Sequence, residues 1–249
     1  MNAFLLCWVL TAPPTPAELI TSELGVPPLA EFTETLHKAY QPDEITIEMV
    51  KKSPQMYPVR AAVNDVSFVM YDAYKLKLKQ ELFEGRMDAN KKELLEIQED
   101  LAEVILKLRE AHDDLAKVAA KRKSEHSRRW EAHLDYLLAA TRLRAASLEE
   151  LNLAYGTVHK NELPKLDEKL MQTGWKIEPT AKMHSKADIR KLDEEARADM
   201  ATLKETYPGT PWAKLAERDL KTEPGLKWVG SVVKPPPPLK VDPKKKKPN

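Results

Sequence analysis

Glycine and proline are both missing from one long stretch of this chain. The sequence has 249 residues but only 7 glycines, and neither glycine nor proline occurs among the 70 residues between Gly85 and Gly156. Helix interiors tolerate these two residues least, because glycine loses the most backbone entropy on ordering and proline lacks an N–H donor. Their absence argues against a loop-rich domain and predicts that residues 88–155 are helical almost throughout, with no strand.

Cysteine is nearly absent, and so are the motifs of common catalytic and cofactor-binding sites. Cys7 is the only cysteine, which excludes a disulfide within the chain. The sequence has no Gly-x-Ser-x-Gly, no phosphate-binding glycine loop, no His-Glu-x-x-His and no Cys-x-x-Cys-His. His112, His126 and His133 could share one helical stripe, but the paired carboxylate pattern of a metal bundle is missing. We therefore predict no enzymatic activity, no catalytic residues, no bound metal and no cofactor.

A large excess of charge of one sign is also missing, since the formal net charge is only +1. This balance does not favour specific nucleic-acid binding. The charge is uneven, however, because residues 234–249 carry six lysines and one aspartate, a formal +5. We expect this proline- and lysine-rich tail to be disordered and solubilising, with weak contact to an anionic polymer or membrane surface as the alternative. A second basic run, Lys121–Arg129, is predicted to be a solvated helix face.

The helical stretch carries an apolar seam whose spacing alternates between three and four residues. This a/d pattern is typical of a coiled coil and favours self-association or pairing with a partner helix. We therefore predict a homo-oligomer or a protein complex. The seam consists of Leu94, Ile97, Leu101, Val104, Leu108, Ala111, Leu115 and Val118. The predicted partner-binding residues are Leu94, Ile97, Leu101, Val104, Leu108, Leu115, Tyr207 and Trp212.

The seam loses its apolar character at Arg122 and His126 and resumes at Trp130, which leaves two alternatives. One is a continuous helix of roughly 105 Å with a shifted seam. The other is a helical hairpin with its tip near Ser124. No glycine, proline, asparagine or aspartate lies at that tip, which favours the continuous helix. A further joint is conceivable at Ser147, whose spacing to Glu150 resembles a capping box.

The first residues, MNAFLLCWVLTA, contain an apolar run that is too short to span a bilayer. It matches the apolar region of an export signal, although no lysine or arginine precedes Phe4. The alternative is a buried N-terminal segment. We predict removal of this segment and a periplasmic or otherwise extracytoplasmic location in a bacterial envelope.

The prolines fall in 13–58 and 164–249 and so divide the chain into three parts, within which local patterns predict five segments. Pro58 opens a helix predicted to run to about Phe83, and Pro164 is predicted to open a short helix that ends at Gly174. Residues 176–186 are predicted to be a loop. The segments are 1–16, an export signal; 17–56, short proline-punctuated helices; 57–163, the long-helix coiled-coil core; 164–231, short helices with one sharp corner; and 232–249, the tail.

The corner is the sharpest local pattern, YPGTPWAKLA from Tyr207 to Ala216. Pro208 and Gly209 end one helix, while Thr210 caps the next, so 186–206 and 210–220 should form an antiparallel pair with Tyr207 and Trp212 at least half buried. The segment resembles the junction between repeats in tetratricopeptide proteins of bacterial envelopes, and C-terminal segments of uncharacterised exported bacterial proteins. This resemblance implies a helical fold and an envelope location. A tetratricopeptide array needs about three repeats, and the chain has one such junction.

The sequence thus predicts an all-α fold with an elongated coiled-coil or helical-hairpin core and short accessory helices. The predicted function is that of a non-enzymatic structural, scaffold or adaptor protein. Two alternatives remain at this point. One is a helical binding module that holds a peptide or glycan near Trp175, Trp212 and Trp228; the other is an enzyme or metal carrier of an unrecognised family.

Overall fold

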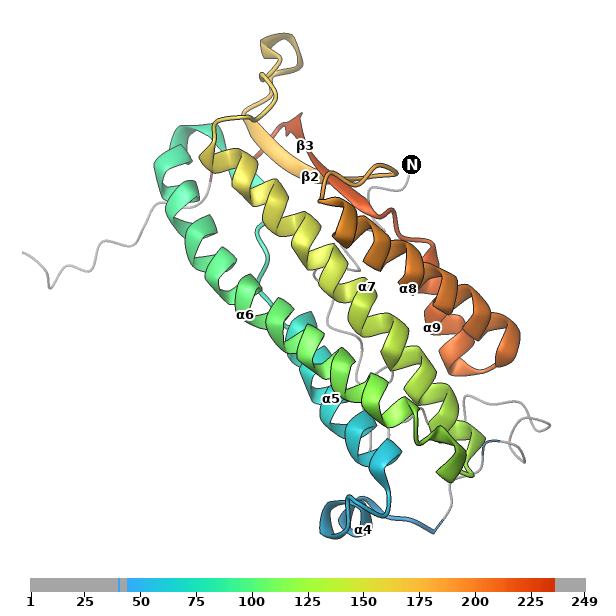
Figure 1. The fold of residues 1–249 in the computed structure, drawn as a ribbon. Coiled ribbons are helices and arrows are strands. Elements are labelled where there is room, and N and C mark those ends of the chain that lie inside the picture. Colours follow the sequence, from blue (N-terminus) through green and yellow to red (C-terminus); the bar gives the residue numbers. More distant parts are fainter. Residues whose placement is uncertain (1–39, 41–43, 236–249) are drawn as a thin grey trace, which may run out of the picture.

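The structure is a computed structural model that describes residues 40 and 44–235. The predicted export signal, the first proline-punctuated helices and the tail beyond 235 lie outside these residues. Two long helices dominate, α6 (Met87–Ala119) and α7 (Arg128–His159), which pack side by side as an antiparallel hairpin (Figure 1). The described part of the chain is mostly helical, as the sequence predicts.

The hairpin turns at residues 120–127, so the favoured prediction of one continuous helix is wrong and the hairpin alternative is the observed arrangement. The turn contains the short 3-10 segment η3 (Arg122–Ser124), closed by hydrogen bonds from Ser124 N–H to Lys121 O and from Glu125 N–H to Arg122 O, both 2.9 Å. In the described chain a positive φ occurs only at Asn161, Met171 and Gly209. This turn therefore needs neither glycine nor asparagine, and their absence says nothing about helix continuity. At the second candidate joint, α7 continues through Ser147.

Glu125 fixes the tip of the hairpin. Its carboxylate accepts the N–H of Ser127 at 2.9 Å, immediately before α7 begins. The same carboxylate forms a bidentate pair with Arg60, with N–O distances of 2.9 and 3.0 Å, and both side chains are buried. Arg60 belongs to α5 (Pro58–Tyr74), so one carboxylate joins three segments of the chain.

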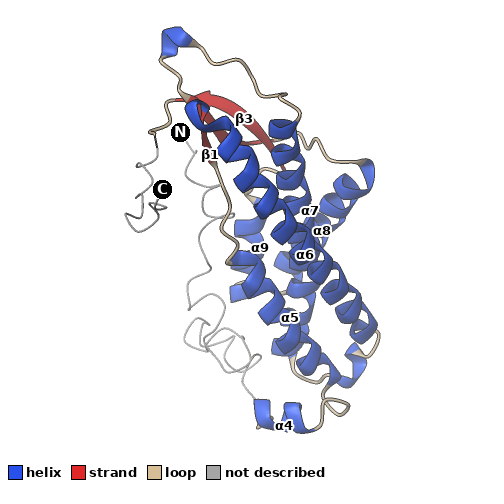
Figure 2. Ribbon diagram, turned by 90° about the vertical axis from the view of Figure 1, so that its left-hand side faces the viewer, coloured by secondary structure: helices blue, strands red, loops and turns tan. Residues whose placement is uncertain are grey.

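Helix α5 packs against both α6 and α7 and is preceded by the short α4 (Ile47–Lys52) (Figure 2). It ends at Tyr74 rather than near Phe83 as predicted. Residues 76–80 belong to neither a helix nor a strand, and the hydroxyl of Tyr155 donates to Lys79 O and accepts from Lys79 N–H, both at 2.9 Å. In a longer α5 the N–H and C=O of Lys79 would take part in helical hydrogen bonds; here the Tyr155 side chain of α7 bonds to both groups instead.

Helices α8 (Ala187–Thr206) and α9 (Pro211–Leu220) confirm the predicted corner. Gly209 has φ 76°, a left-handed conformation that favours glycine. The Thr210 hydroxyl accepts the Ala213 N–H at 3.3 Å and so caps α9. Tyr207 and Trp212 are 1% and 0% exposed, which confirms their predicted burial.

A small antiparallel sheet caps one end of the hairpin, so the all-α prediction is wrong in this detail. Its strands are β1 (Glu81–Phe83), β2 (Gly174–Thr180) and β3 (Gly225–Ser231), in the order β1-β2-β3. Strand β1 is followed by the 3-10 turn η2 (Glu84–Arg86). The helix predicted after Pro164 is only the 3-10 turn η4 (Glu168–Leu170), and Gly174 opens a strand instead of ending a helix.

The register explains which side of the sheet faces the helices. Trp175 lies opposite Gly230 and Ile177 opposite Trp228, and this face packs on the hairpin. Glu178 lies opposite Lys227 on the outer face, which is polar. A Cβ on Gly174 would come within 1.9 Å of the carbonyl oxygen of Leu82, so the close approach of β1 and β2 requires glycine there.

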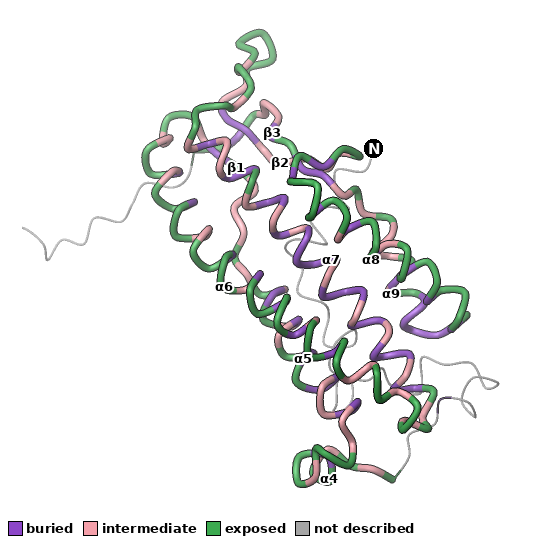
Figure 3. The backbone as a smooth tube through the Cα atoms, in the orientation of Figure 1, coloured by how far each residue is buried: buried purple, intermediate pink, exposed green. Residues whose placement is uncertain are grey.

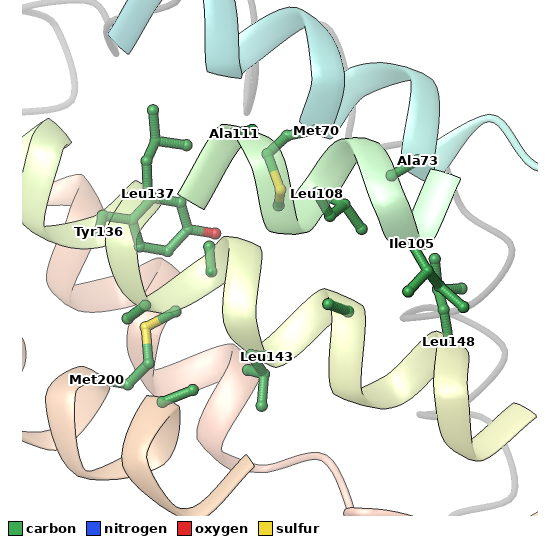
Figure 4. Packing of buried hydrophobic residues seen from close by; sticks show 14 of the residues in the cluster. Met70, Ala73, Ile105, Leu108, Ala111, Tyr136, Leu137, Leu143, Leu148 and Met200 are labelled. Carbon is green, nitrogen blue, oxygen red and sulfur yellow. The ribbon is translucent and has the colours of Figure 1, made fainter. Parts of the chain in front are cut away.

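Helix α7 lies at the centre of the molecule and is buried along most of its length (Figure 3). It contacts α5, α6, α8, α9 and β3. Figure 4 shows Leu108 and Ile105 of α6, Met70 of α5 and Met200 of α8 converging on it. Small residues such as Ala139 and Ala145 let these neighbours approach closely.

Candidate functional site

An open and mostly apolar pocket lies between the C-terminal half of α7 and strand β3. Its volume is about 210 Å³. Helix α7, the segment that follows it, the loop before α8 and strand β3 all contribute to the wall. The lining residues are Glu150, Leu153, Ala154, Thr157, Glu162, Pro164, His184, Leu226, Lys227 and Trp228. We call this site the α7–β3 pocket.

Glu150 holds the walls of the pocket together. It is only 1% exposed, and its carboxylate accepts the N–H groups of His184 at 2.8 Å and Ser185 at 2.9 Å, the Ser185 hydroxyl, and the N–H of Leu226 at 3.4 Å. A buried carboxylate is costly unless such donors surround it. Glu150 therefore serves as an internal anchor that ties the loop before α8 and the start of β3 to α7.

Trp228 forms the apolar floor together with Leu226 and Ala154. Its indole N–H donates to Ala154 O at 2.8 Å, and its ring centre lies 6.4 Å from that of Tyr155. The neighbouring Trp175 donates its N–H to Pro164 O, also at 2.8 Å, and so fixes the segment that closes one side. Both indoles are thus oriented by hydrogen bonds within the core, and Trp228 alone of the two lines the pocket.

The rim of the pocket is polar. His184, Glu162 and Lys227 are exposed there, and the hydroxyl of Thr157 donates to Ala154 O at 2.8 Å within α7. The apolar floor can accept an aliphatic or aromatic group, while the rim offers both signs of charge to groups that flank it. This arrangement is suited to binding an apolar group with polar neighbours.

The predicted seam residues lie inside the molecule. Leu94, Leu101, Leu108 and Leu115 are fully buried against α5 and α7, whereas Ile97 and Val104 are partly buried in the same core. Ala111 is buried and Val118 partly buried in the same core. The seam pairs α6 with helices of its own chain, which leaves these side chains little surface for another molecule.

The other two predicted partner-binding residues, Tyr207 and Trp212, are also internal. They lie at the hairpin tip, where Trp212 packs 5.9 Å from the ring of Tyr40 and 6.1 Å from His133. Trp175 and Trp228 lie at the sheet end, so the three predicted tryptophans do not line one groove. Of the three, only Trp228 lines the α7–β3 pocket.

The basic run 121–129 is only partly the solvated face that the sequence predicts. Lys121 and Lys123 are exposed, but Arg122 donates to Asp135 at 2.8 Å and to the Tyr207 hydroxyl at 2.7 Å. The Tyr207 hydroxyl in turn donates to Asp135 at 2.7 Å. Burial raises the pKa of Asp135, and Tyr207 and Arg122 oppose that shift. Arg128 donates to Thr206 O at 3.1 Å, so this residue and Arg122 join the hairpin tip to the α8–α9 corner. Arg128 and Arg129 also donate to Tyr40.

The three histidines of the predicted stripe lie in different environments. His133 is buried between Trp130 and Trp212, and burial, with help from Arg129, lowers its pKa to about 3. His112 is half-buried and its pKa is lowered by burial and by Arg142. His126 is exposed. Among residues 40 and 44–235, no three His, Cys, Asp or Glu side chains are grouped so that they could hold a metal ion.

A second buried polar cluster joins α7 to α9. Tyr136 donates to Asp219 at 3.1 Å, and Arg218 pairs with the same carboxylate at 3.1 Å. Burial raises the pKa of Asp219, opposed by Arg218 and Tyr136, and burial also raises the pKa of Tyr136. The cluster is enclosed and has a structural role.

Sequence reasoning missed the residues that build the pocket. The spacing of Glu150 to Ser147 suggests only half of a capping box at a helix start. Leu226 lies in a segment that the sequence predicts to be short helices. Leu226, Lys227 and Trp228 alternate between apolar and polar, and β-branched Val229 follows, which together give a short strand-like signal. Only the fold, however, brings this strand to α7.

Comparison with models of protein families, with curated proteins and with solved structures finds no match to this chain. Within the described residues, no helix combines the length and apolar character needed to cross a membrane.

Proposed function

We propose that this protein is a non-enzymatic adaptor of the bacterial envelope, in which the helical hairpin is a rigid frame and the α7–β3 pocket is the point of contact with a polypeptide partner. The observation that carries the proposal is the pocket itself, an apolar hollow beside Trp228 with a polar rim. The seam residues are buried within the chain, so a partner has to contact another surface, which supports the proposal indirectly.

The size of the pocket favours a side chain over a free small molecule. Small-molecule sites usually measure about 300 to 1,000 Å³, whereas this pocket measures about 210 Å³. That volume suits one leucine, phenylalanine or tryptophan side chain inserted by a peptide. The exposed rim residues His184, Glu162 and Lys227 can then contact the flanking residues of the peptide.

The walls are suited to this use because they are held in place before a partner arrives. Glu150 and the indole N–H of Trp228 both bind the walls to α7. Ordering a site in advance reduces the entropy lost on binding. A glycan, the other ligand considered from the tryptophans, is less favoured because the three indoles are not in one groove.

Chemical-shift mapping can test the pocket with defined probes, the acetylated and amidated forms of leucine, phenylalanine and tryptophan. We expect shifts for Leu153, Leu226 and Trp228, and their loss in Leu153→Glu, which places a charge on the pocket wall. Leu95→Glu on α6 is the matched control, since Leu95 is also exposed. Shifts confined to another surface, or equal shifts in both variants, would contradict the proposal.

The envelope location rests on the N-terminal apolar run and on the corner resemblance, and it has a separate test. Protein purified from its native host should begin near Ala17 when its N-terminus is sequenced. Recovery of an N-terminus at Met1 would remove the export part of the proposal and leave the pocket unaffected.

A further inference from the structure

The sheet end of the molecule carries a cluster of exposed apolar side chains. In the described chain the four most exposed large apolar residues are Met171, Met56, Val232 and Leu170, at 76%, 72%, 66% and 62%. Three of these four lie at the sheet end. Leu170 and Met171 occupy the tip of the loop between α7 and β2, which projects beyond the sheet (Figure 1). Exposed apolar side chains gathered at one projecting point mark an interaction surface more often than scattered ones do.

The loop is built to hold this tip outward. The Asp167 carboxylate accepts the N–H of Lys169 at 2.9 Å, and the Asp167 carbonyl accepts that of Leu170 at 3.1 Å. Met171 has φ 51°, a left-handed conformation unusual for a side chain of this kind. Gln172 accepts the Asp167 N–H at 2.8 Å and donates to Gly230 O at 3.0 Å, which anchors the loop on β3. These bonds fix the loop without burying its two apolar residues.

The third apolar residue, Val232, lies at the base of this loop. The neighbouring Val233 accepts a hydrogen bond from the Thr173 hydroxyl at 2.8 Å and donates to the same oxygen at 2.9 Å. The chain therefore leaves β3 beside the loop and enters the lysine-rich sequence from this point. Residues 234–249 carry a formal charge of +5. The loop tip itself is balanced, with Lys165 and Lys169 against Asp167 and Glu168.

We propose that the sheet end docks on an anionic lipid bilayer surface. Leu170, Met171 and Val232 enter the interfacial layer, and the lysines of 234–249 contact the acidic headgroups. Stable attachment to a bilayer generally takes two signals, and an apolar insertion combined with a basic segment is such a pair. The tertiary structure brings the loop tip, which carries Leu170 and Met171, to the end of the molecule where the described chain stops at residue 235, just after the first lysine of the basic sequence, Lys234.

Flotation with vesicles tests the proposal on the full chain. We use phosphatidylcholine vesicles with and without phosphatidylserine, at low and high salt. Binding should require phosphatidylserine and weaken with salt. The double variant Leu170→Asp, Met171→Asp should lose about tenfold or more in affinity, since each methylene withdrawn from the interface weakens attachment. Deletion of 236–249 should also lose about tenfold or more.

Met56→Asp is the matched control, because Met56 is equally exposed but lies far from the sheet end, between α4 and α5. It should bind as the wild type does, and so should Leu153→Glu, which separates this surface from the α7–β3 pocket. Absence of vesicle binding would overturn the proposal. Binding that survives the tip variant but is lost on deletion of 236–249 would show a general polyanion contact of the tail and overturn the proposal as well. Equal binding of the wild type and the tip variant to dextran sulfate would be the sign of such a contact. Binding that persists in every variant would assign attachment to the N-terminal apolar run instead.

Discussion

Helix α6 and all but the last turn of α7 come from the same glycine- and proline-free stretch, yet the two helices are buried very differently. Helix α6 buries 7 of its 33 residues, along one stripe that faces α5 and α7. Helix α7 buries 20 of its 32 residues, on every side. The difference follows from position: α6 is an outer helix with a solvent face, and α7 is the central helix around which the other elements pack. A repeating apolar seam therefore identifies the outer helix here, and the loss of that repeat identifies the central one.

The largest effect is expected for the single buried stripe of α6. Leu108→Asp puts a charge into a fully buried position without a partner and should lower the free energy of unfolding by about 5 kcal/mol or more. Leu106→Asp, two residues away and 57% exposed, should change it very little. Chemical denaturation of both variants measures the contrast. Similar losses in the two variants would mean that α6 has no solvent face in solution.

The burial of α7 on all sides predicts a pH dependence through His133. Its folded pKa of about 3 lies below the ordinary value of 6.5, so the unfolded chain binds a proton there that the folded chain does not. Stability is therefore unaffected by His133 above pH 6.5 and falls as the pH is lowered towards 3, by roughly 5 kcal/mol in all. His133→Phe should flatten the stability profile between those values. If the slope is unchanged in this variant, the wild-type His133 is exposed and has an ordinary pKa.

Trp212 tests how firmly the α8–α9 corner is joined to the central helix. It is fully buried beside His133 of α7, so Trp212→Ala should cost roughly 3 kcal/mol. Hydrogen exchange should show faster exchange in 189–220 while α6 keeps its protection. Uniform loss of protection along the chain would show instead that the corner and the hairpin unfold as one unit.

The smallest effect concerns alanines on the two helices. Ala139→Leu overfills a site on α7 that is 0% exposed and should cost about 1 to 3 kcal/mol. Ala102→Leu on the exposed face of α6 should cost nothing measurable. Thermal melting of the pair suffices for this comparison. A tolerated leucine at position 139 would indicate that α7 packs more loosely than the structure shows.

The burial of the α6 seam also bears on the oligomeric state. The seam alone predicts a homo-oligomer, whereas its burial against α5 and α7 predicts a monomer unless another surface associates. Light scattering on the purified chain distinguishes these outcomes directly.

Local sequence was sufficient for the features that depend on neighbouring residues. Helix in most of 88–155 follows from composition and periodicity, and the end of α8 and the start of α9 follow from Pro208, Gly209 and Thr210. Each of these signals acts within a few residues, through backbone conformation or capping. The burial of Tyr207 and Trp212 was predictable for a related reason, because two short amphipathic helices have few other apolar side chains to cover.

Tertiary structure alone decided the hairpin, the sheet and both proposed surfaces. The turn at 120–127 uses ordinary negative φ angles and is held by Glu125 and Arg60, which are 65 residues apart. Strand β1 exists because β2 pairs with it more than 90 residues later, and the pocket exists because Glu150 accepts donors from two distant segments. Such contacts depend on which surfaces pack together when the chain folds, and the spacing of residues along the sequence does not predict that packing. The sequence by itself determined where helices can form, and long-range packing determined how they fold back on one another and what the resulting surfaces can bind.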